Sequence, residues 1–205
     1  MMRGDGWQKA YELSVDLAVD KLRATDLSAC CDRSGATWQT EAGCADVEFL
    51  GSTYRVCPPD FEVVLAESGE PATIWEKILL LHYLETARGT TPTGKWVTFG
   101  EVPGGHIYMP VFAARSVDRI LRAYAGNESA LTEAARDVGG EPADTGDVSV
   151  VLRPLPRVPV MLILWRADEE LPASGSLLFD SSVTDYLPME DIVVLAGMVA
   201  SRLSP

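Results

Sequence analysis

The segment Ala72-Thr-Ile-Trp-Glu-Lys-Ile-Leu-Leu-Leu-His-Tyr-Leu-Glu-Thr-Ala-Arg88 decides the fold, because its pattern is helical and it is apolar almost all round. A helix without a fully polar face is normally buried, so we expect this segment to be the central helix of the core. Its apolar side chains are Ile74, Trp75, Ile78, Leu79, Leu80, Leu81 and Leu84. His82 falls among them, and a lone histidine there is more often a hydrogen-bonded core residue than a ligand.

Helical periodicity recurs on both sides of this segment. Residues 7–23 place Trp7, Tyr11, Val15, Ala18 and Leu22 on one face, opposite a charged face that includes Lys9. Residues 110–125 predict a third helix with Pro110 in its first turn, and residues 127–140 predict a short helix that ends at glycine. A terminal helix is expected to begin near Pro188 and to bury Ile192, Val193, Ala196, Val199 and Leu203.

Strand-like runs form two blocks. Residues 35–40, 45–50 and 52–57 are β-rich and punctuated by glycine, which predicts an antiparallel meander, and residues 147–154, 158–165 and 176–180 form the second block. Neither block has enough strands for a sheet of reasonable size, so we expect residues 36–57 and 147–180 to join in one antiparallel or mixed sheet. The predicted fold class is therefore α+β: a single domain over residues 1–205, with a helical middle and a C-terminal helix.

Composition restricts the partners. The chain has 205 residues, 47% of them hydrophobic, and its 17 basic and 30 acidic residues give a net charge of −13. So acidic a protein repels nucleic acid and anionic membranes alike, and we expect neither as a partner. No run of some 18 apolar residues occurs, and the first residues lack the pattern of a signal peptide, so a cytoplasmic location is expected.

The cysteines are Cys30, Cys31, Cys44 and Cys57. In a reducing cytoplasm disulfides are not expected, and the absence of a Cys-x-x-Cys pair favours buried or incidental thiols over a metal or cluster site. Asp168-Glu169-Glu170 could offer three oxygens to a cation, but adjacent side chains in a loop rarely converge, which favours a solvated turn. The sequence therefore predicts no metal site.

The most site-like segment is Gly94-Lys-Trp-Val-Thr-Phe-Gly-Glu-Val-Pro-Gly-Gly-His-Ile-Tyr108. Gly104 and Gly105 allow positive φ and leave amide groups free to contact a ligand. The aromatic residues Trp96, Phe99 and Tyr108 could supply flat apolar walls, which together would make a pocket rim. The alternative is that the glycines only make a turn and the aromatics belong to the core.

For each polar residue near this segment, the sequence allows both a functional and a structural interpretation. His106 could be an axial ligand or a proton carrier near neutral pH, or an ordinary surface histidine. Arg115, Arg119 and Arg122, at i, i+4 and i+7 of the predicted helix, could grip an anionic group or form a solvated face. Asp180 ends an apolar strand before two serines, where a capping role is favoured over a catalytic one.

Several motifs follow one another in a specific order: Leu81-His-Tyr-Leu84, Gly94 to Gly105 with Tyr108, Leu155-Pro-Arg-Val-Pro159, Trp165, Asp168-Glu-Glu and Leu178-Phe-Asp180. Over nearly the whole chain this order resembles domain-of-unknown-function family 3786, found in bacteria and archaea, many of them anaerobes. The resemblance implies a stand-alone, ligand-binding domain in an anaerobic cytoplasm, with no catalytic residues to carry over. Some relatives resemble iron-sulphur proteins through an added cysteine-rich segment, which is missing here.

Three functions follow as hypotheses. The leading one is a binding domain for a small organic ligand or planar cofactor, with Arg115 or Arg119 meeting an anionic substituent; corrin or haem would suit such a pocket, but no residue pattern selects a cofactor. Its predicted ligand-binding residues are Trp96, Phe99, Glu101, Gly104, Gly105, His106, Tyr108, Arg115 and Arg119.

The second hypothesis is an enzyme that uses Glu101 and His106 as acid and base. The third is a protein-interaction subunit, which predicts a large exposed apolar patch and no deep pocket near Gly105. The sequence decides neither between the three functions nor on an oligomeric state.

Overall fold

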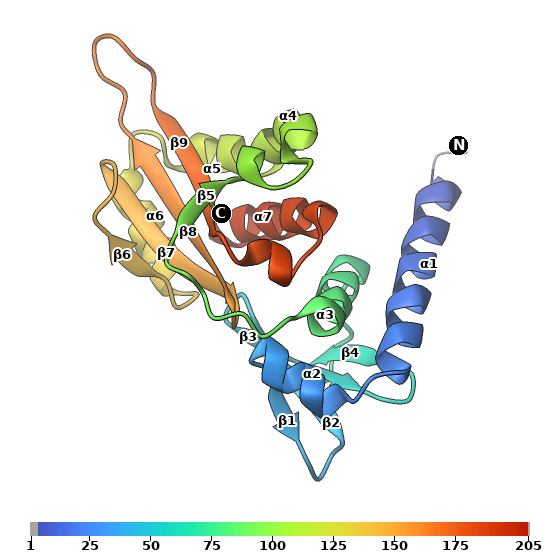
Figure 1. Cartoon of the computed structure of the whole chain (residues 1–205). Helices are drawn as coiled ribbons and strands as arrows, with labels where there is room; N and C mark the ends of the chain where they lie inside the picture. Colours follow the sequence, from blue (N-terminus) through green and yellow to red (C-terminus); the bar gives the residue numbers. More distant parts are fainter. Residues whose placement is uncertain (1–3, 205) are drawn as a thin grey trace. The chain divides into compact units, whose positions relative to one another are not determined.

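The structure is a computed structural model that describes residues 4–204, and the chain divides into two compact units (Figure 1). The N-terminal unit runs to Thr90 and the C-terminal unit begins at Thr91. Within the described residues no helix has the length and apolar character needed to cross a bilayer.

The N-terminal unit is a four-stranded antiparallel meander with three helices (Figure 1). The strands pair in sequence order, which confirms the meander predicted for residues 35–57 and extends it by a fourth strand. In chain order its elements are α1 (Gly4–Arg23), α2 (Leu27–Ser34), β1 (Thr37–Gln39), β2 (Cys44–Phe49), β3 (Ser52–Cys57), β4 (Glu62–Leu65) and α3 (Ile74–Thr86). The side chains of Trp7 and Lys9, placed on α1 by the sequence pattern, lie outside the described side chains.

Helix α3 is the core helix of this unit, as predicted. Leu79, Leu80, Leu81 and Leu84 are completely buried. The helix starts at a capping box, in which Thr73 Oγ1 accepts from the Glu76 amide at 3.4 Å and Glu76 Oε2 accepts from the Thr73 amide at 2.7 Å. His82 is hydrogen-bonded, as expected, with 3.3 Å between its Nε2 and Ser14 Oγ on α1.

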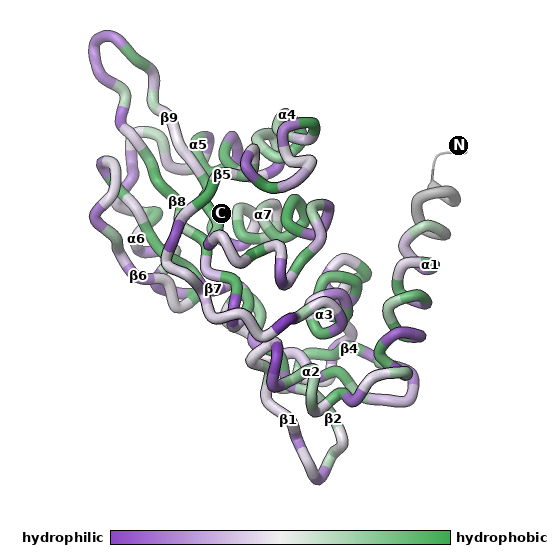
Figure 2. Tube along the Cα trace, viewed as in Figure 1, coloured by the Kyte–Doolittle hydropathy of each residue, from purple (hydrophilic) through white to green (hydrophobic). Residues whose placement is uncertain are grey.

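The C-terminal unit is built on a five-stranded antiparallel sheet of order β5-β9-β8-β7-β6. Its central strand β8 is buried from Val158 to Leu164 and strongly hydrophobic in Figure 2. The elements are β5 (Trp96–Thr98), η1 (Phe99–Glu101), α4 (Gly105–Arg115), α5 (Val117–Tyr124), α6 (Glu128–Arg136), β6 (Glu141–Ala143), β7 (Val148–Leu155), β8 (Val158–Trp165), β9 (Ser174–Asp180), η2 (Val183–Asp185) and α7 (Met189–Leu203). Helix α7 buries the five apolar residues predicted for it.

The α+β class, the antiparallel pairing and the C-terminal helix are confirmed, but the expected single sheet is wrong. The two strand blocks form separate sheets, because each recruits short strands that make it large enough. In the second sheet these are the three-residue strands β5, which pairs with β9, and β6, which pairs with β7. That residues 1–205 form a single domain stays a prediction.

The helix predicted over residues 110–125 is also different in the structure. Helix α4 begins five residues earlier, at Gly105, so Pro110 lies inside it rather than in its first turn. The chain then breaks at Ser116, whose φ and ψ are −120° and −84°, and continues as α5. Arg115 and Arg119 therefore lie on different helices, and the predicted arginine row on one helix does not exist.

A disulfide joins Cys44 and Cys57, which corrects the expectation that none would form. The two residues stand opposite each other next to the pair Ala45 and Val56 of the β2–β3 hairpin, with their Cα atoms 4.5 Å apart. The register of the hairpin makes Cys44 and Cys57 neighbours. Their spacing in the sequence alone does not reveal that they are close. Cys30 and Cys31 are free and buried in α2, in agreement with the buried-thiol prediction.

Candidate functional site

The connection from β5 to α4 contains most of the predicted site residues, and local contacts explain several of them. Glu101 Oε2 accepts hydrogen bonds from the amide and the hydroxyl of Thr98, at 2.7 Å and 2.8 Å. The Thr98 amide, and then its hydroxyl, lower the pKa of Glu101. The carboxylate therefore serves as a cap for the short helix η1.

The glycine pair starts α4. Gly104 has φ of 81°, a left-handed conformation that glycine adopts without strain. Gly105 has a different role, because a Cβ built on it would lie 1.9 Å from the Phe99 carbonyl oxygen. Its amide also donates to the Val102 carbonyl at 2.8 Å. Close backbone packing and a tight turn thus account for both glycines.

Phe99 lies in the core, which is the alternative to a pocket wall that the sequence left open for the aromatic residues. Only 1% of it is exposed. Its ring stacks on Phe112 of α4 with centroids 4.4 Å apart, and Phe112 in turn contacts Phe179 of β9 at 6.0 Å. Trp96 is half-buried on the edge strand β5, and Tyr108 is exposed on α4. The three aromatics therefore have three different environments.

Helix α4 turns most of its surface to solvent. Only Gly105 and Phe112 are buried in it. Ile107, Pro110, Val111 and Ala114 are all exposed, at the i, i+3, i+4 and i+7 spacing that puts side chains on one helix face. We call these four residues the α4 apolar face. Tyr108 and Met109 are also exposed, but only Tyr108 lies at the margin of this face, because the helical spacing puts Met109 on the other side of α4.

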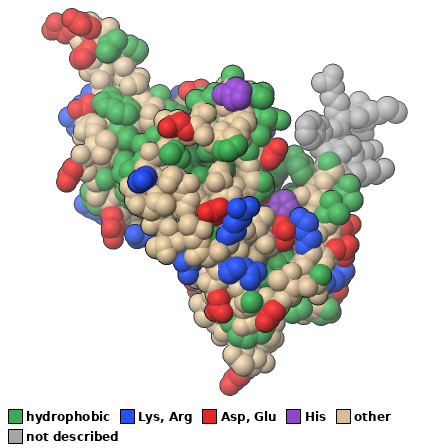
Figure 3. Space-filling model, in the orientation of Figure 1, with side chains coloured by type: hydrophobic (Ala, Val, Ile, Leu, Met, Phe, Trp, Pro, Cys, Tyr) green, Lys and Arg blue, Asp and Glu red, His purple; other side chains and the backbone are tan. Residues whose placement is uncertain are grey.

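The exposure of this face is large for aliphatic side chains. Ile107 is 70% exposed and Val111 is 42% exposed. Four of the ten large hydrophobic residues that are exposed in the described part of the chain lie on this helix, although it has only 11 residues. Figure 3 shows hydrophobic side chains gathered on the surface at the place of α4. Helix α4 therefore carries the largest share of this exposure, and the other six residues are distributed over other parts of the described chain.

Ionisable residues stand near both ends of helix α4. Glu101 precedes the helix and is exposed, as is His106 in the first turn. Arg115 is exposed in the last turn, and its stem runs beside α7, where a Cβ on Gly197 would lie 3.7 Å from Arg115 Cβ. Arg119 is half-buried on the separate helix α5. That Arg115 or Arg119 meets an anionic substituent of a ligand stays a prediction.

Asp180 has a structural role, as its capping pattern predicts, because its carboxylate accepts several hydrogen bonds from neighbouring segments. It is buried at the end of β9 and accepts hydrogen bonds from the amides of Thr93, Gly94 and Ser182, at 3.0 Å, 2.7 Å and 2.9 Å, and from the Ser182 hydroxyl at 2.7 Å. Burial acts to raise the pKa of Asp180, but the hydrogen bonds together bring it below its usual value. These bonds hold the segment before β5 against the end of β9.

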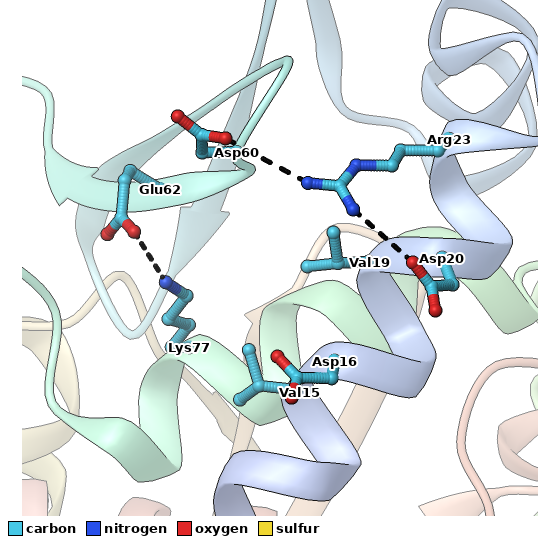
Figure 4. Close-up of a pocket in the computed structure, with 8 residues that line it drawn as sticks. All are labelled: Val15, Asp16, Val19, Asp20, Arg23, Asp60, Glu62 and Lys77. Carbon is cyan, nitrogen blue, oxygen red and sulfur yellow. Dashed lines mark hydrogen bonds and ion pairs between the residues drawn. The ribbon is translucent and has the colours of Figure 1, made fainter.

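A groove of about 370 Å³ in the N-terminal unit was not predicted (Figure 4). It is lined by Val15, Asp16, Val19, Asp20, Arg23, Asp60, Glu62 and Lys77. Lys77 Nζ lies 3.0 Å from Glu62 Oε1, and Arg23 bridges Asp20 at 3.3 Å and Asp60 at 3.8 Å. Both cations already have carboxylate partners, and the lining carries more carboxylates than cations, so the groove is acidic. The charged face predicted for residues 7–23 was a sequence signal for part of this lining, but a charged face also fits a helix that is simply exposed to solvent.

The described residues contain no group of three or more histidine, cysteine or carboxylate side chains placed to hold a metal ion. What they define is an α+β protein with two antiparallel sheets and an exposed apolar face on helix α4. The family model for a domain of unknown function, DUF3786, matches residues 26–202, and the chain belongs to this family. The resemblance of the ordered motifs is thereby confirmed. No curated protein matches the chain, and no solved structure does.

Proposed function

We propose that this protein is an interaction domain that binds a protein partner through the α4 apolar face. The observation that carries the proposal is the concentration of exposed aliphatic side chains on α4, with Ile107 70% exposed. Single exposed apolar residues are normal, but a contiguous set with charged residues around it is typical of an interaction surface. Covering Ile107 and Val111 would contribute roughly 1–2 kcal/mol each from the apolar area removed from water.

The local structure supports this proposal over an acid-base enzyme. Glu101 is held by Thr98 and its pKa is lowered, so it stays ionised near neutral pH and is poorly matched to proton transfer there. Asp180, for which a catalytic role was the alternative to capping, accepts hydrogen bonds from three backbone amides and from the Ser182 hydroxyl. Neither predicted acid-base residue has gained a partner that would activate it.

The small-ligand pocket stays a prediction that rests on fewer residues. Phe99 is in the core, Gly105 is packed on a carbonyl oxygen, and Glu101 is a cap. Trp96, His106 and Tyr108 remain accessible in part. Flat absorption spectra and an unchanged melting temperature on titration with corrin or haem would remove this alternative.

The proposal is tested by photo-crosslinking in the cells that make the protein. Ile107 is replaced with the photoreactive residue benzoylphenylalanine, and the matched control carries it at Glu133, an exposed position of α6. We expect discrete crosslinked species from position 107 that disappear when Val111→Asp is added, and none from position 133. Equal labelling from both positions, or no product from position 107, would show that the α4 apolar face is not an interface.

A further inference from the structure

We infer that the partner of the α4 apolar face is the same face of a second copy of this chain, with the two α4 helices packed antiparallel about a twofold axis near Pro110 and Val111. This inference rests on the proposed function and names its partner. An interface of this kind is isologous, since one patch meets itself, and it closes at two copies. Docking of α4 on any other surface of a second copy would be heterologous and could continue into open chains.

The side chains of the face are self-complementary in size. When two such helices run antiparallel with the axis between positions 110 and 111, Ile107 of one copy stands opposite Ala114 of the other. Pro110 stands opposite Val111 in the same way. Each large aliphatic side chain thus meets a small or flat residue, which is the alternation that lets facing helices interdigitate.

The charges at the ends of the face are also complementary in this orientation. Glu101 lies before the first turn of α4 and Arg115 lies in its last turn, and both are exposed. An antiparallel pair brings the acidic end of each helix toward the basic end of the other, and this happens twice by symmetry. Like ends would meet in a parallel pair. Antiparallel packing also places the opposite ends of the two helix dipoles side by side.

The size of the face predicts a weak dimer. Helix α4 has 11 residues and is therefore about 16 Å long. A contact limited to this helix falls at the low end of specific interfaces, so we expect a dissociation constant on the order of 10–100 µM. Each copy carries a net charge of −13, and their mutual repulsion weakens the contact further at low salt.

The inference is tested by sedimentation velocity on the full chain at physiological salt, from micromolar to several hundred micromolar. We expect the dimer fraction to rise with concentration, and Ile107→Asp to weaken the dimer at least 10-fold. The matched control is Leu171→Asp, which changes another strongly exposed leucine, 66% exposed in the β8–β9 loop. If Ile107→Asp does not fold, as judged by circular dichroism, Val111→Ser replaces it.

A second measurement tests the predicted register by trapping the dimer with a disulfide across the twofold axis. Val111→Cys lies next to the proposed axis, so mild oxidation should give a covalent dimer, whereas Leu171→Cys should give none. A wild-type chain that stays monomeric throughout overturns the inference, as does a dimer that Ile107→Asp leaves intact. Crosslinks from position 107 to proteins of other mass would in that case still support the proposed function, so the two failures are distinguishable.

Discussion

Gly105 lies directly against the backbone of Phe99: a Cβ at Gly105 would be 1.9 Å from the Phe99 carbonyl oxygen. The contact fixes the first turn of α4 on the short helix η1. It also sets which face of α4 meets the core, because Phe112 can then stack on Phe99. The exposure of Ile107 and Val111 on the opposite side follows from this rotation of the helix.

Gly105→Ala should therefore destabilise the protein. The methyl group would collide with a backbone oxygen that cannot rotate away, and overpacking of this kind costs about 1–3 kcal/mol or more. Gly100→Ala is the matched control in the same segment, since its Cβ would find the nearest atoms at 3.8 Å. Urea unfolding of the two variants checks this. Equal stability would mean that η1 and α4 separate easily.

Asp180→Asn should weaken the C-terminal unit and flatten its pH dependence. The folded-state pKa of Asp180 is lowered, so its stabilising contribution is present above the unfolded value, near pH 4, and is lost as pH falls through the folded value. An asparagine presents one oxygen where two accept amides, at a cost of roughly 2–4 kcal/mol at pH 7.

Unfolding free energies at pH 7 and pH 3 measure the Asp180 effect. The wild type should lose more stability than Asp180→Asn between the two values. Asp137→Asn, at an exposed position after α6, controls for the general effect of removing a carboxylate. Parallel losses in wild type and Asp180→Asn would indicate that the acid sensitivity comes from other carboxylates.

The disulfide predicts a defined thiol count. Alkylation of the unfolded, unreduced chain should label two cysteines, Cys30 and Cys31, and reduction should raise the count to four. Replacing both Cys44 and Cys57 with alanine should cost about 2–4 kcal/mol, since a cross-link restricts the unfolded chain. Four labelled cysteines before reduction would show that the bond is not formed in the isolated protein.

Local patterns predicted helices and strands well, whereas pairing between distant segments was not predictable. The burial of α3 follows from its all-round apolar pattern, and the β1–β3 meander follows from short runs separated by glycine. The division into two sheets depends on β5 and β6, strands of three residues each, and β6 contains Pro142. Such short strands carry no periodic signal, so only their partners β9 and β7 define them.

For the candidate site, too, the sequence predicted local structure only in part and did not predict which side chains are exposed. Gly104-Gly105 is typical of a loop, and Pro110 is typical of a first helical turn, so α4 was predicted to start too late. The i, i+3, i+4, i+7 spacing of Ile107, Pro110, Val111 and Ala114 was a signal for the helix. Spacing alone cannot show that this face is exposed while Phe112 is buried, because that depends on the Phe99 and Gly105 contact.

Leu81→Ala should cost roughly 2–5 kcal/mol, because Leu81 is completely buried in α3 and its truncation leaves a cavity. Leu13→Ala is the control, since Leu13 on α1 is 59% exposed and its removal should change stability by less than about 0.5 kcal/mol. Denaturant unfolding of both variants tests this. A loss below about 1 kcal/mol for Leu81→Ala would mean that α3 is not the core helix.

Two substitutions on α4 separate binding from stability. Ile107→Ser removes an exposed side chain, so the free energy of unfolding should change by no more than about 0.5 kcal/mol. Phe112→Ala, five residues later on the same helix, removes the ring that stacks on Phe99. It should lower the free energy of unfolding by about 3–5 kcal/mol. Circular dichroism during urea titration, at a concentration below the dimer range, measures both. A marked loss in Ile107→Ser would assign Ile107 to the core packing of the unit and remove the basis for an interaction surface on α4.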